Sequence, residues 1–329
     1  MSRRSLAAVA SLAAAALALS ACGGGNAGSG STSPAADAGK TYEIGITQIV
    51  THPSLDAARE GFKEALKSGG ITANFDEQNA QGDQATATSI ANNFKSKDLV
   101  LAIATPTAQA VAQVITDKPV LFTAVTDPVT AKLVNTLESP GANVTGTTDL
   151  NPVKEQIDLV KEINPNAKTV GIVYSSGEVN SEVQVKLAQE AAAAIGLTVE
   201  TKTVSNSGEV AQAANSLNVD AFYVPTDNIV VSAIESIIGA AEAKKIPVIA
   251  GEGDSVKRGA VATFGIDYRA LGEQTGEMAI KILKDGADPA TMPVENQKEP
   301  KTVVNPGAAE KAGVTLPEEL VKRADEVVE

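Results

Sequence analysis

The chain has few of the residues on which most metal sites and catalytic sites depend. Its 329 residues include one cysteine, one histidine and no tryptophan, and aromatic residues make up 3% of the sequence. Zinc, haem and iron–sulfur sites need Cys or His ligands, and a nucleophilic Ser or Cys needs a His base. Such sites are nearly excluded unless they are built on His52. We therefore expect no cofactor, no metal and no internal disulfide.

Positive charge is also scarce. The chain has 27 Lys and Arg against 40 Asp and Glu, so its formal net charge is −13, and it contains no basic run. Proteins that bind nucleic acid neutralise phosphates with clustered Lys and Arg. We therefore expect no nucleic-acid partner. If Arg3 and Arg4 were removed with an N-terminal signal segment, the net charge of the remaining chain would be −15 (−13 − 2). A surface of anionic lipid would repel a protein of this charge.

The single cysteine follows the one long apolar run. Arg3 and Arg4 precede an uncharged Ala/Leu/Val stretch that ends at Leu19-Ser20-Ala21-Cys22. This pattern is typical of a secretory signal, and the run is short of the roughly 20 residues that span a membrane. The last four residues resemble the lipobox of bacterial lipoproteins, whose cysteine is diacylated; an ordinary signal peptide with an incidental Cys22 is the alternative. We expect a signal peptide at 1–21, a flexible linker at 22–40, and a body lipid-anchored through Cys22 on the extracytoplasmic face of the cell membrane.

From Tyr42 onward, short β-branched runs alternate with longer amphipathic patterns. Glu43–Thr47 precedes the helical pattern Ser54–Leu66, and Thr72–Asp76 precedes Ala85–Phe94. Alternation of this kind indicates parallel strands joined by crossover helices, the doubly wound α/β class.

The same pattern then starts again. Gly45, Gly70 and Gly82 have counterparts at Gly171, Gly196 and Gly208, and each pair is separated by the same 126 residues. Three glycine landmarks at one offset favour two homologous lobes over the loose repetition of any α/β protein. A chain of this length also exceeds the usual size of a single core.

Extended segments join the two predicted lobes. Val144–Asp149 (VTGTTD) and Ala262–Asp267 (ATFGID) end the two copies, and a Pro-rich stretch follows the helix predicted at Leu271–Leu283. We interpret these as chain crossings that form a three-strand hinge. The first lobe is then 41–146 plus about 266–292, and the second is 147–265 plus about 293–329.

Several segments resemble one family. They are ITQIVTHPSLDAAREGF at Ile46–Phe62, NAQGDQ at Asn79–Gln84, ATPTAQA at Ala104–Ala110, FTAVTDPV at Phe122–Val129, VPTDN at Val224–Asn228 and DSVKRGAVATFGIDY at Asp254–Tyr268. These segments are similar to those of the ABC-transporter substrate-binding lipoproteins of tryptophan or tyrosine uptake. The resemblance implies a type I periplasmic-binding-protein fold with three crossings. It also implies capture of a small solute, often an aromatic amino acid, for an ABC permease.

In open α/β sheets, ligands bind beyond the carboxyl ends of the strands. Polar side chains gather at these positions, although Thr, Asp and Asn there also commonly cap helices. The candidate ligand-binding residues are Gln48, Thr105, Thr107, Thr126 and Asp127 on the first lobe, and Tyr174, Ser175, Asn180, Thr226, Asp227, Asn228 and Asp254 on the second.

The same positions suit a zwitterionic ligand. Asp127, Asp227 and Asp254 could each receive an ammonium group, and the helix that begins near Thr105 could receive a carboxylate. No arginine occupies a strand-end loop, which argues against phosphate. For stacking on an aromatic ligand we favour Tyr174 over Tyr268, and we interpret Tyr223 and Phe264 as core residues.

His52 precedes Pro53, a residue suited to the first position of a helix. It could belong only to that helix start, and we favour instead a place at the rim of the cleft beside Gln48. It has no visible catalytic partner, and no nucleophile motif, metal set or phosphate loop occurs. We therefore expect a binding protein and not an enzyme. A solute-binding component of an ABC importer, closing about a hinge, is the leading hypothesis. A sensory receptor of the same fold is the alternative.

Overall fold

The computed structural model describes residues 39–328. The predicted signal peptide, Cys22 and all of the predicted linker before Gly39 lie outside the described residues. Among the residues that are described, no helix is long and apolar enough to cross a membrane.

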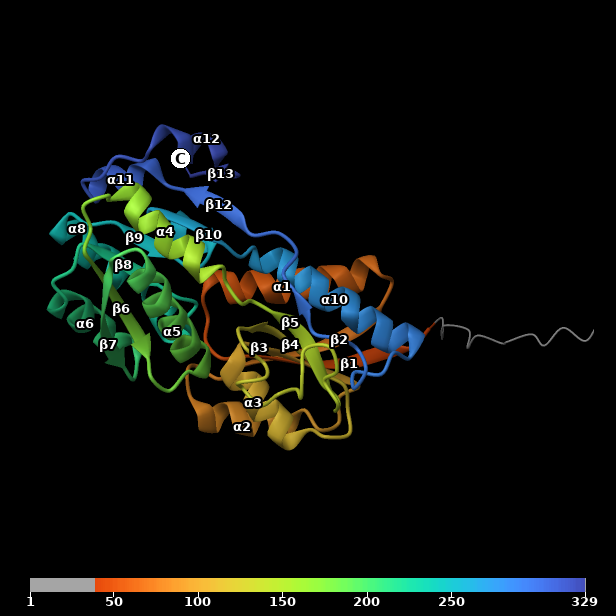
Figure 1. The fold of residues 1–329 in the computed structure, drawn as a ribbon. Helices are drawn as coiled ribbons and strands as arrows, with labels where there is room; N and C mark the ends of the chain where they lie inside the picture. Colours follow the sequence, from red (N-terminus) through yellow and green to blue (C-terminus); the bar gives the residue numbers. More distant parts are fainter. Residues whose placement is uncertain (1–38, 329) are drawn as a thin grey trace, which may run out of the picture. The chain divides into compact units, whose positions relative to one another are not determined.

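The first sheet has the strand order β2-β1-β3-β4-β5, with all pairs parallel. Helix α1 lies on one side of this sheet, and α2 and α3 lie on the other (Figure 1). The elements are β1 (Thr41–Gln48), α1 (Pro53–Ser68), β2 (Thr72–Asn79), α2 (Gln84–Asn93), β3 (Leu99–Ile103), α3 (Thr105–Val114), β4 (Val120–Val125) and β5 (Val144–Thr148).

The second sheet repeats this plan in the order β7-β6-β8-β9-β10. Helices α4 and α5 pack together, as do α6 and α8. The elements are α4 (Val153–Ile163), β6 (Thr169–Ser175), α5 (Val179–Ala194), β7 (Thr198–Val204), the 3₁₀ helix η1 (Ser207–Glu209), α6 (Val210–Ser216), β8 (Ala221–Val224), α7 (Asn228–Ser232), α8 (Ile234–Lys244), β9 (Val248–Ala250), α9 (Gly253–Lys257) and β10 (Ala262–Gly265).

The remaining elements return to both sheets. Helix α10 packs beside α1, and β11 pairs with β5 of the first sheet. Strand β12 then joins β10 antiparallel, and β13 pairs with β12. Their bounds are α10 (Tyr268–Asp285), β11 (Glu295–Asn296), β12 (Lys301–Val304), α11 (Pro306–Lys311), α12 (Glu318–Arg323) and β13 (Glu326–Val327).

The chain therefore passes between the sheets after β5, after β10 and after β11, and the predicted fold class is confirmed. Two expected boundaries differ from the strand bounds by a few residues. β5 stays in the first sheet to Thr148, and β11 keeps residues 295–296 there because its backbone pairs with Thr147 and Thr148. We call the part built on the first sheet lobe 1 and the part built on the second sheet lobe 2.

The repeated glycines have a packing reason. A Cβ at Gly45 in β1 would lie 2.7 Å from the ring of Phe94, which follows α2. A Cβ at Gly171 in β6 would lie 2.9 Å from Phe222 and from Val219. In both lobes the first strand thus needs glycine because apolar side chains are packed directly onto its backbone.

Helices α1 and α10 approach each other closely (Figure 1). A Cβ at Gly272 would lie 1.9 Å from the carbonyl oxygen of Ala58, and one at Gly61 would lie 2.2 Å from that of Arg269. The glycines let the two backbones touch, so the late helix α10 is an integral part of lobe 1. Lobe 1 has a single continuous core, whereas lobe 2 has one apolar cluster on each face of its sheet.

Candidate functional site

A small cavity of about 10 Å³ lies at the carboxyl ends of the strands, between residues of both lobes. This is the place that open parallel sheets provide for ligands. Lobe 1 contributes residues of β4 and at the starts of α1 and α10, lobe 2 contributes the segments after β8 and β9, and Asp149 lies on the crossing after β5. The lining residues are His52, Leu55, Ala124, Asp149, Thr226, Asn228, Val231, Glu252 and Tyr268.

The backbone of lobe 1 is strained beside this cavity. Ala124 has φ of 57° within a bulge of β4, and Ala104, at the end of the neighbouring β3, has φ of 81°. Left-handed conformations at residues other than glycine cost about 1–3 kcal/mol and gather at functional sites. The bulge turns Ala124 into the cavity wall, where its small side chain leaves room.

Two buried carboxylates give the cavity its charge. Asp149 accepts hydrogen bonds from the Tyr268 hydroxyl at 2.6 Å and the Thr126 hydroxyl at 2.9 Å. Glu252 caps α9 by accepting from the backbone N–H of Asp254 and Ser255. Burial raises the pKa of both carboxyls. Since the lining contains no Lys or Arg, the cavity suits a cationic group such as an ammonium.

His52 is neutral in this environment. It is the residue before α1, and its side chain is buried in the cavity. Burial, aided by the positive charge of Arg258, lowers the pKa of His52 to about 3. Its Nδ1 has no hydrogen-bond partner within the described part of the chain. An imidazole in this state can offer the ligand a hydrogen bond without adding charge.

Three hydroxyls of lobe 1 share this lack of a partner. Within residues 39–328, Thr47 Oγ1, Ser54 Oγ and Thr105 Oγ1 are buried and unbonded. They lie at the end of β1 and at the starts of α1 and α3, on the side where the strands end. Buried polar atoms are nearly always paired, so such a group of exceptions calls for a functional explanation.

The equivalent end of lobe 2 is tied together internally. Asp227 accepts from the backbone N–H of Ser175 at 2.6 Å, from the Ser181 hydroxyl at 2.7 Å and from the N–H of Val230 at 2.8 Å. Gln184 donates to Thr226 Oγ1 at 2.8 Å and accepts from its backbone N–H at 3.1 Å. We call these residues, together with Glu178 and Asn180, the lobe 2 network.

The structure brings only part of the predicted residue set to the cavity. His52, Thr226 and Asn228 line it, and Thr126 touches it through Asp149. His52 lies inside the cavity and not at a rim beside Gln48, because Gln48 turns toward α1 and donates to Asp56. Among the tyrosines, Tyr268 lines the cavity, while Tyr174 packs against the lobe 2 core.

Most other candidates make contacts within the protein. The Thr107 hydroxyl donates to the Ile103 carbonyl, and Asp127 caps its own turn through Thr130. Asp227 caps α7. For Thr107, Asp227 and Asn228, the sequence also allowed helix capping as the alternative role. Successive residues at a strand end point to opposite faces of the sheet, so only some of them can face the cavity. The remaining candidates that do not line the cavity are Thr105, Ser175 and Asn180.

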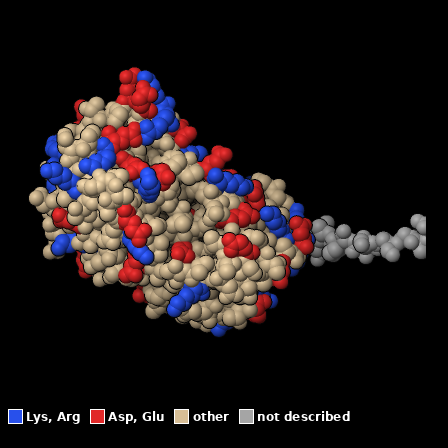
Figure 2. Space-filling view, viewed as in Figure 1, with Lys and Arg blue, Asp and Glu red and all other residues tan. Residues whose placement is uncertain are grey.

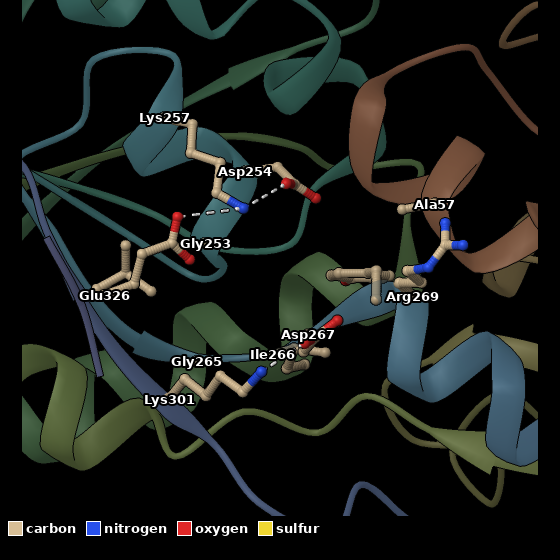
Figure 3. A pocket seen from close by; sticks show the side chains of 12 residues that line it. Ala57, Gly253, Asp254, Lys257, Gly265, Ile266, Asp267, Arg269, Lys301 and Glu326 are labelled. Atoms are coloured by element: carbon tan, nitrogen blue, oxygen red, sulfur yellow. Dashed lines mark hydrogen bonds and ion pairs between the residues drawn. The ribbon is translucent and has the colours of Figure 1, made fainter. Parts of the chain in front are cut away.

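Asp254 belongs to a second pocket of about 260 Å³ (Figure 3). Lys257 reaches both Asp254 and Glu326 there, and Lys301 pairs with Asp267. The charges of this pocket are therefore largely paired with one another. Elsewhere on the face shown in Figure 2, Lys and Arg are interspersed with Asp and Glu, without a large field of one sign.

The two cavity carboxylates were missed by sequence reasoning. Asp149 ends the crossing segment VTGTTD, and Glu252 lies two residues before Asp254, which was chosen instead. A carboxylate on a crossing between the lobes is a usable signal, because the crossings meet where the cleft closes. Among residues 39–328, no group of three His, Cys, Asp or Glu side chains could hold a metal ion.

Residues 43–328 match the family described as ABC transporter substrate binding protein. The chain belongs to this family. It is therefore a binding protein and not an enzyme, as the sequence predicted, and its family places it outside the cytoplasm beside an ABC permease.

Relatives of this binding protein carry named ligands. The tyrosine-binding protein of Clostridioides difficile is 44% identical over 82% of this chain and 80% of its own length. The structure of the ABC domain in complex with L-Trp from Streptococcus pneumoniae is 38% identical, covers 88% of this chain and all of the other, and has a TM-score of 0.84.

A further solved structure allows the conformation of this chain to be compared with an open and a ligand-bound state. The ligand-free, open structure of a substrate binding protein from Clostridium difficile is 44% identical and covers 87% of this chain and 99% of its own, yet its TM-score is 0.66. The chain thus superposes better on the L-Trp complex, although its sequence is less similar to that protein. Its conformation is therefore closer to that of the ligand-bound relative than to that of the open one.

Proposed function

We propose that this binding protein captures an aromatic L-amino acid between its lobes and delivers it to an ABC importer. The observation that carries the proposal is the cavity between the lobes, where Asp149 and Glu252 are buried among Leu55, Ala124 and Val231. Carboxylates suit the ammonium group, and apolar walls suit an aromatic side chain. The relatives described as tyrosine-binding and as an L-Trp complex support the same class of ligand.

Hinge closure supplies the mechanism. The ligand ammonium contacts Asp149 on a crossing, while its other groups meet residues of both lobes. A ligand that contacts both lobes binds the closed state better than the open state and so shifts the population toward it. The imidazole of His52, which lines the cavity and has no partner at Nδ1 among the described residues, then gains a hydrogen-bond partner.

Isothermal titration calorimetry tests this function. The full chain, purified in detergent and refolded from denaturant to remove any bound solute, is titrated with L-tyrosine, L-tryptophan and tyramine, which lacks the carboxylate. We expect the two amino acids to bind. Asp149→Asn should weaken their binding at least roughly thirtyfold, because breaking a buried charge pair costs about 2 kcal/mol or more.

The matched control is Asp117→Asn, which changes an exposed carboxylate of lobe 1. It should leave binding unchanged. If neither amino acid binds the refolded protein, or if Asp149→Asn binds them as well as the unchanged chain does, the proposed function is wrong.

We also propose that Cys22 carries a lipid that holds the protein on the extracytoplasmic face of the membrane. The Leu-Ser-Ala-Cys sequence supports this proposal. The Cys22→Ser protein should move from the membrane fraction to the soluble fraction, and its continued sedimentation with membranes would contradict the anchor.

A further inference from the structure

Asn228 lies at the apolar part of the cavity. It is the first residue of α7, and Val231 lies three residues further on the same helix. Residues three apart on a helix share a face, and both line the cavity. Leu55 of α1 lines the same cavity. The amide of Asn228 is thus a polar group that lies beside the apolar wall of the cavity.

Glu178 holds this amide in one orientation. It is a buried residue just before α5, and its Oε2 accepts from both the backbone N–H of Asn228 at 3.1 Å and the side-chain Nδ2 of Asn228. Asn180 Nδ2 donates to Oε2 at 3.0 Å, and the N–H of Ile229 donates to Oε1 at 3.3 Å. Every one of these neighbours is a donor, so Glu178 acts as an acceptor.

The orientation of Asn228 follows from these contacts. Three N–H groups donate to Oε2 of Glu178 and one donates to Oε1, so a proton held by Glu178 would lie on Oε1. A flipped amide would then still place Oδ1 against Oε2, and oxygen facing oxygen is repulsive. With Nδ2 engaged by Glu178, Oδ1 is the end that remains for the cavity. An amide oxygen accepts hydrogen bonds and donates none. The cavity therefore presents an acceptor at this point.

The ammonium of an amino acid has better partners elsewhere. Asp149 and Glu252 place carboxyl groups in the same cavity, and the charge-assisted hydrogen bond between an ammonium and a carboxylate is about twice as strong as a neutral one. Asn228 is then left for a second donor, carried on the side chain of the ligand. Tyrosine has a phenolic O–H and tryptophan an indole N–H, whereas phenylalanine has neither.

We propose that Asn228 selects aromatic amino acids whose ring carries a hydrogen-bond donor, and that Glu178 is the positioning residue that aims its carbonyl oxygen. The inference rests on the proposed function and narrows its ligand class. A site built to hydrogen-bond a ligand hydroxyl rejects the analogue that lacks it, because the buried partner is left unpaired.

The test compares four ligands that differ only at the ring. L-tyrosine and 4-amino-L-phenylalanine carry a donor, whereas L-phenylalanine and 4-fluoro-L-phenylalanine do not, and fluorine keeps the ring substituent small. Calorimetry on the full refolded chain should show the two donors binding at least roughly tenfold more tightly than the other two. The measured quantity is the ratio of dissociation constants, phenylalanine over tyrosine.

Three variants locate the origin of this ratio. Asn228→Ala should bring the four ligands to within about threefold of one another, with tyrosine losing affinity and phenylalanine changing little. Glu178→Ala should also lower the ratio, because the amide of Asn228 can then rotate. Glu178→Gln should keep the ratio, since its oxygen can take the place of Oε2, which receives three of the four donors.

Glu182→Gln is the matched control, because it changes an exposed carboxylate on α5, the helix that follows Glu178. It should leave every affinity unchanged. The inference is overturned if phenylalanine binds the unchanged chain as tightly as tyrosine, or if the ratio survives in Asn228→Ala. Either result would leave the proposed function standing, whereas failure of all four ligands to bind would remove the function itself.

Discussion

Lobes 1 and 2 share a strand order but differ in whether the polar side chains at their strand ends have hydrogen-bond partners within the protein. In lobe 1, the hydroxyls at the end of β1 and at the starts of α1 and α3 are buried and have no partner among the described residues. They belong to Thr47, Ser54 and Thr105. In lobe 2, the corresponding ends are joined by the network around Asp227 and Glu178, in which Asn180 Oδ1 is the one side-chain atom buried without a partner among the described residues. One lobe is preorganised, and the other keeps hydrogen-bonding capacity for a ligand. The difference teaches that, of two lobes with the same fold, one can supply a rigid surface and the other can supply the groups that recognise the ligand.

The strongest test of this comparison is Asp227→Ala. The substitution leaves donors of Ser175, Ser181 and Val230 without their acceptor, and each buried group left unpaired costs about 1–3 kcal/mol. We expect the free energy of unfolding to fall by about 3 kcal/mol or more, measured by urea unfolding. The lobe 1 control is Asp127→Ala, whose contacts are local and exposed and whose loss should cost less than about 1 kcal/mol. Equal costs for the two would contradict the comparison.

The two lobes should also respond to pH with opposite signs. Burial, aided by the charge of Asp227, raises the pKa of Glu178 from 4.5 to about 8. The folded state then holds a proton that the unfolded chain releases, so this contribution to stability is complete below pH 4.5 and is lost as the pH rises toward 8. The pKa of His52 is lowered from 6.5 to about 3. Its contribution is complete above pH 6.5 and is lost as the pH falls toward 3.

Melting temperatures of the ligand-free protein between pH 4 and 9 measure these contributions. Glu178→Gln should flatten the decline on the alkaline side, and His52→Gln should flatten the decline on the acidic side. The pKa values of Asp149, Asp227 and Glu252 are raised as well, so some alkaline decline should persist in Glu178→Gln. A profile that neither variant alters would show that these buried groups do not titrate differently on folding.

The smallest expected effect belongs to Thr105→Val in lobe 1. Valine has nearly the same shape and removes a buried hydroxyl that has no partner, so the substitution should change the stability of the ligand-free protein by less than about 0.5 kcal/mol. Ser181→Ala, in the lobe 2 network, removes a hydroxyl that donates to Asp227 and should cost about 1 kcal/mol. Thermal unfolding of the two variants measures both stability losses. A larger loss of stability for Thr105→Val than for Ser181→Ala would contradict the view that the polar groups of lobe 2 stabilise the fold while those of lobe 1 do not.

The sequence allowed the alternating elements and the two lobes to be predicted because both leave periodic signals. The spacing of Gly45 and Gly171 reflects packing that each lobe repeats, with an apolar side chain seated on the first strand. The carboxyl-end rule also led to Thr226 and Asn228, which line the cavity together with His52, for which a place at the rim of the cleft was predicted. These features depend on the order of residues along the chain, which is what a sequence records.

The remaining site residues depend on side-chain direction. Asp127, Asp227 and Asp254 follow strands just as expected, yet one caps its own turn, one caps α7 and one pairs with Lys257 in another pocket. Which way a side chain turns after a strand is decided by neighbours from distant segments. Asp149 was missed for the same reason, because its partner Tyr268, the first residue of α10, lies 119 residues later in the chain.

The contact between α1 and α10 has a consequence for how the chain folds. Leu55, Phe62 and Leu66 of α1 are buried, and the backbone of α10, more than 200 residues later, lies directly against that helix. Lobe 1 cannot complete its core until synthesis has passed residue 285, whereas the central segment of lobe 2 is contiguous. Contacts of such long sequence separation form slowly. A nascent chain that ends within lobe 2 should therefore expose the apolar face of α1, and that state is the one a chaperone would recognise.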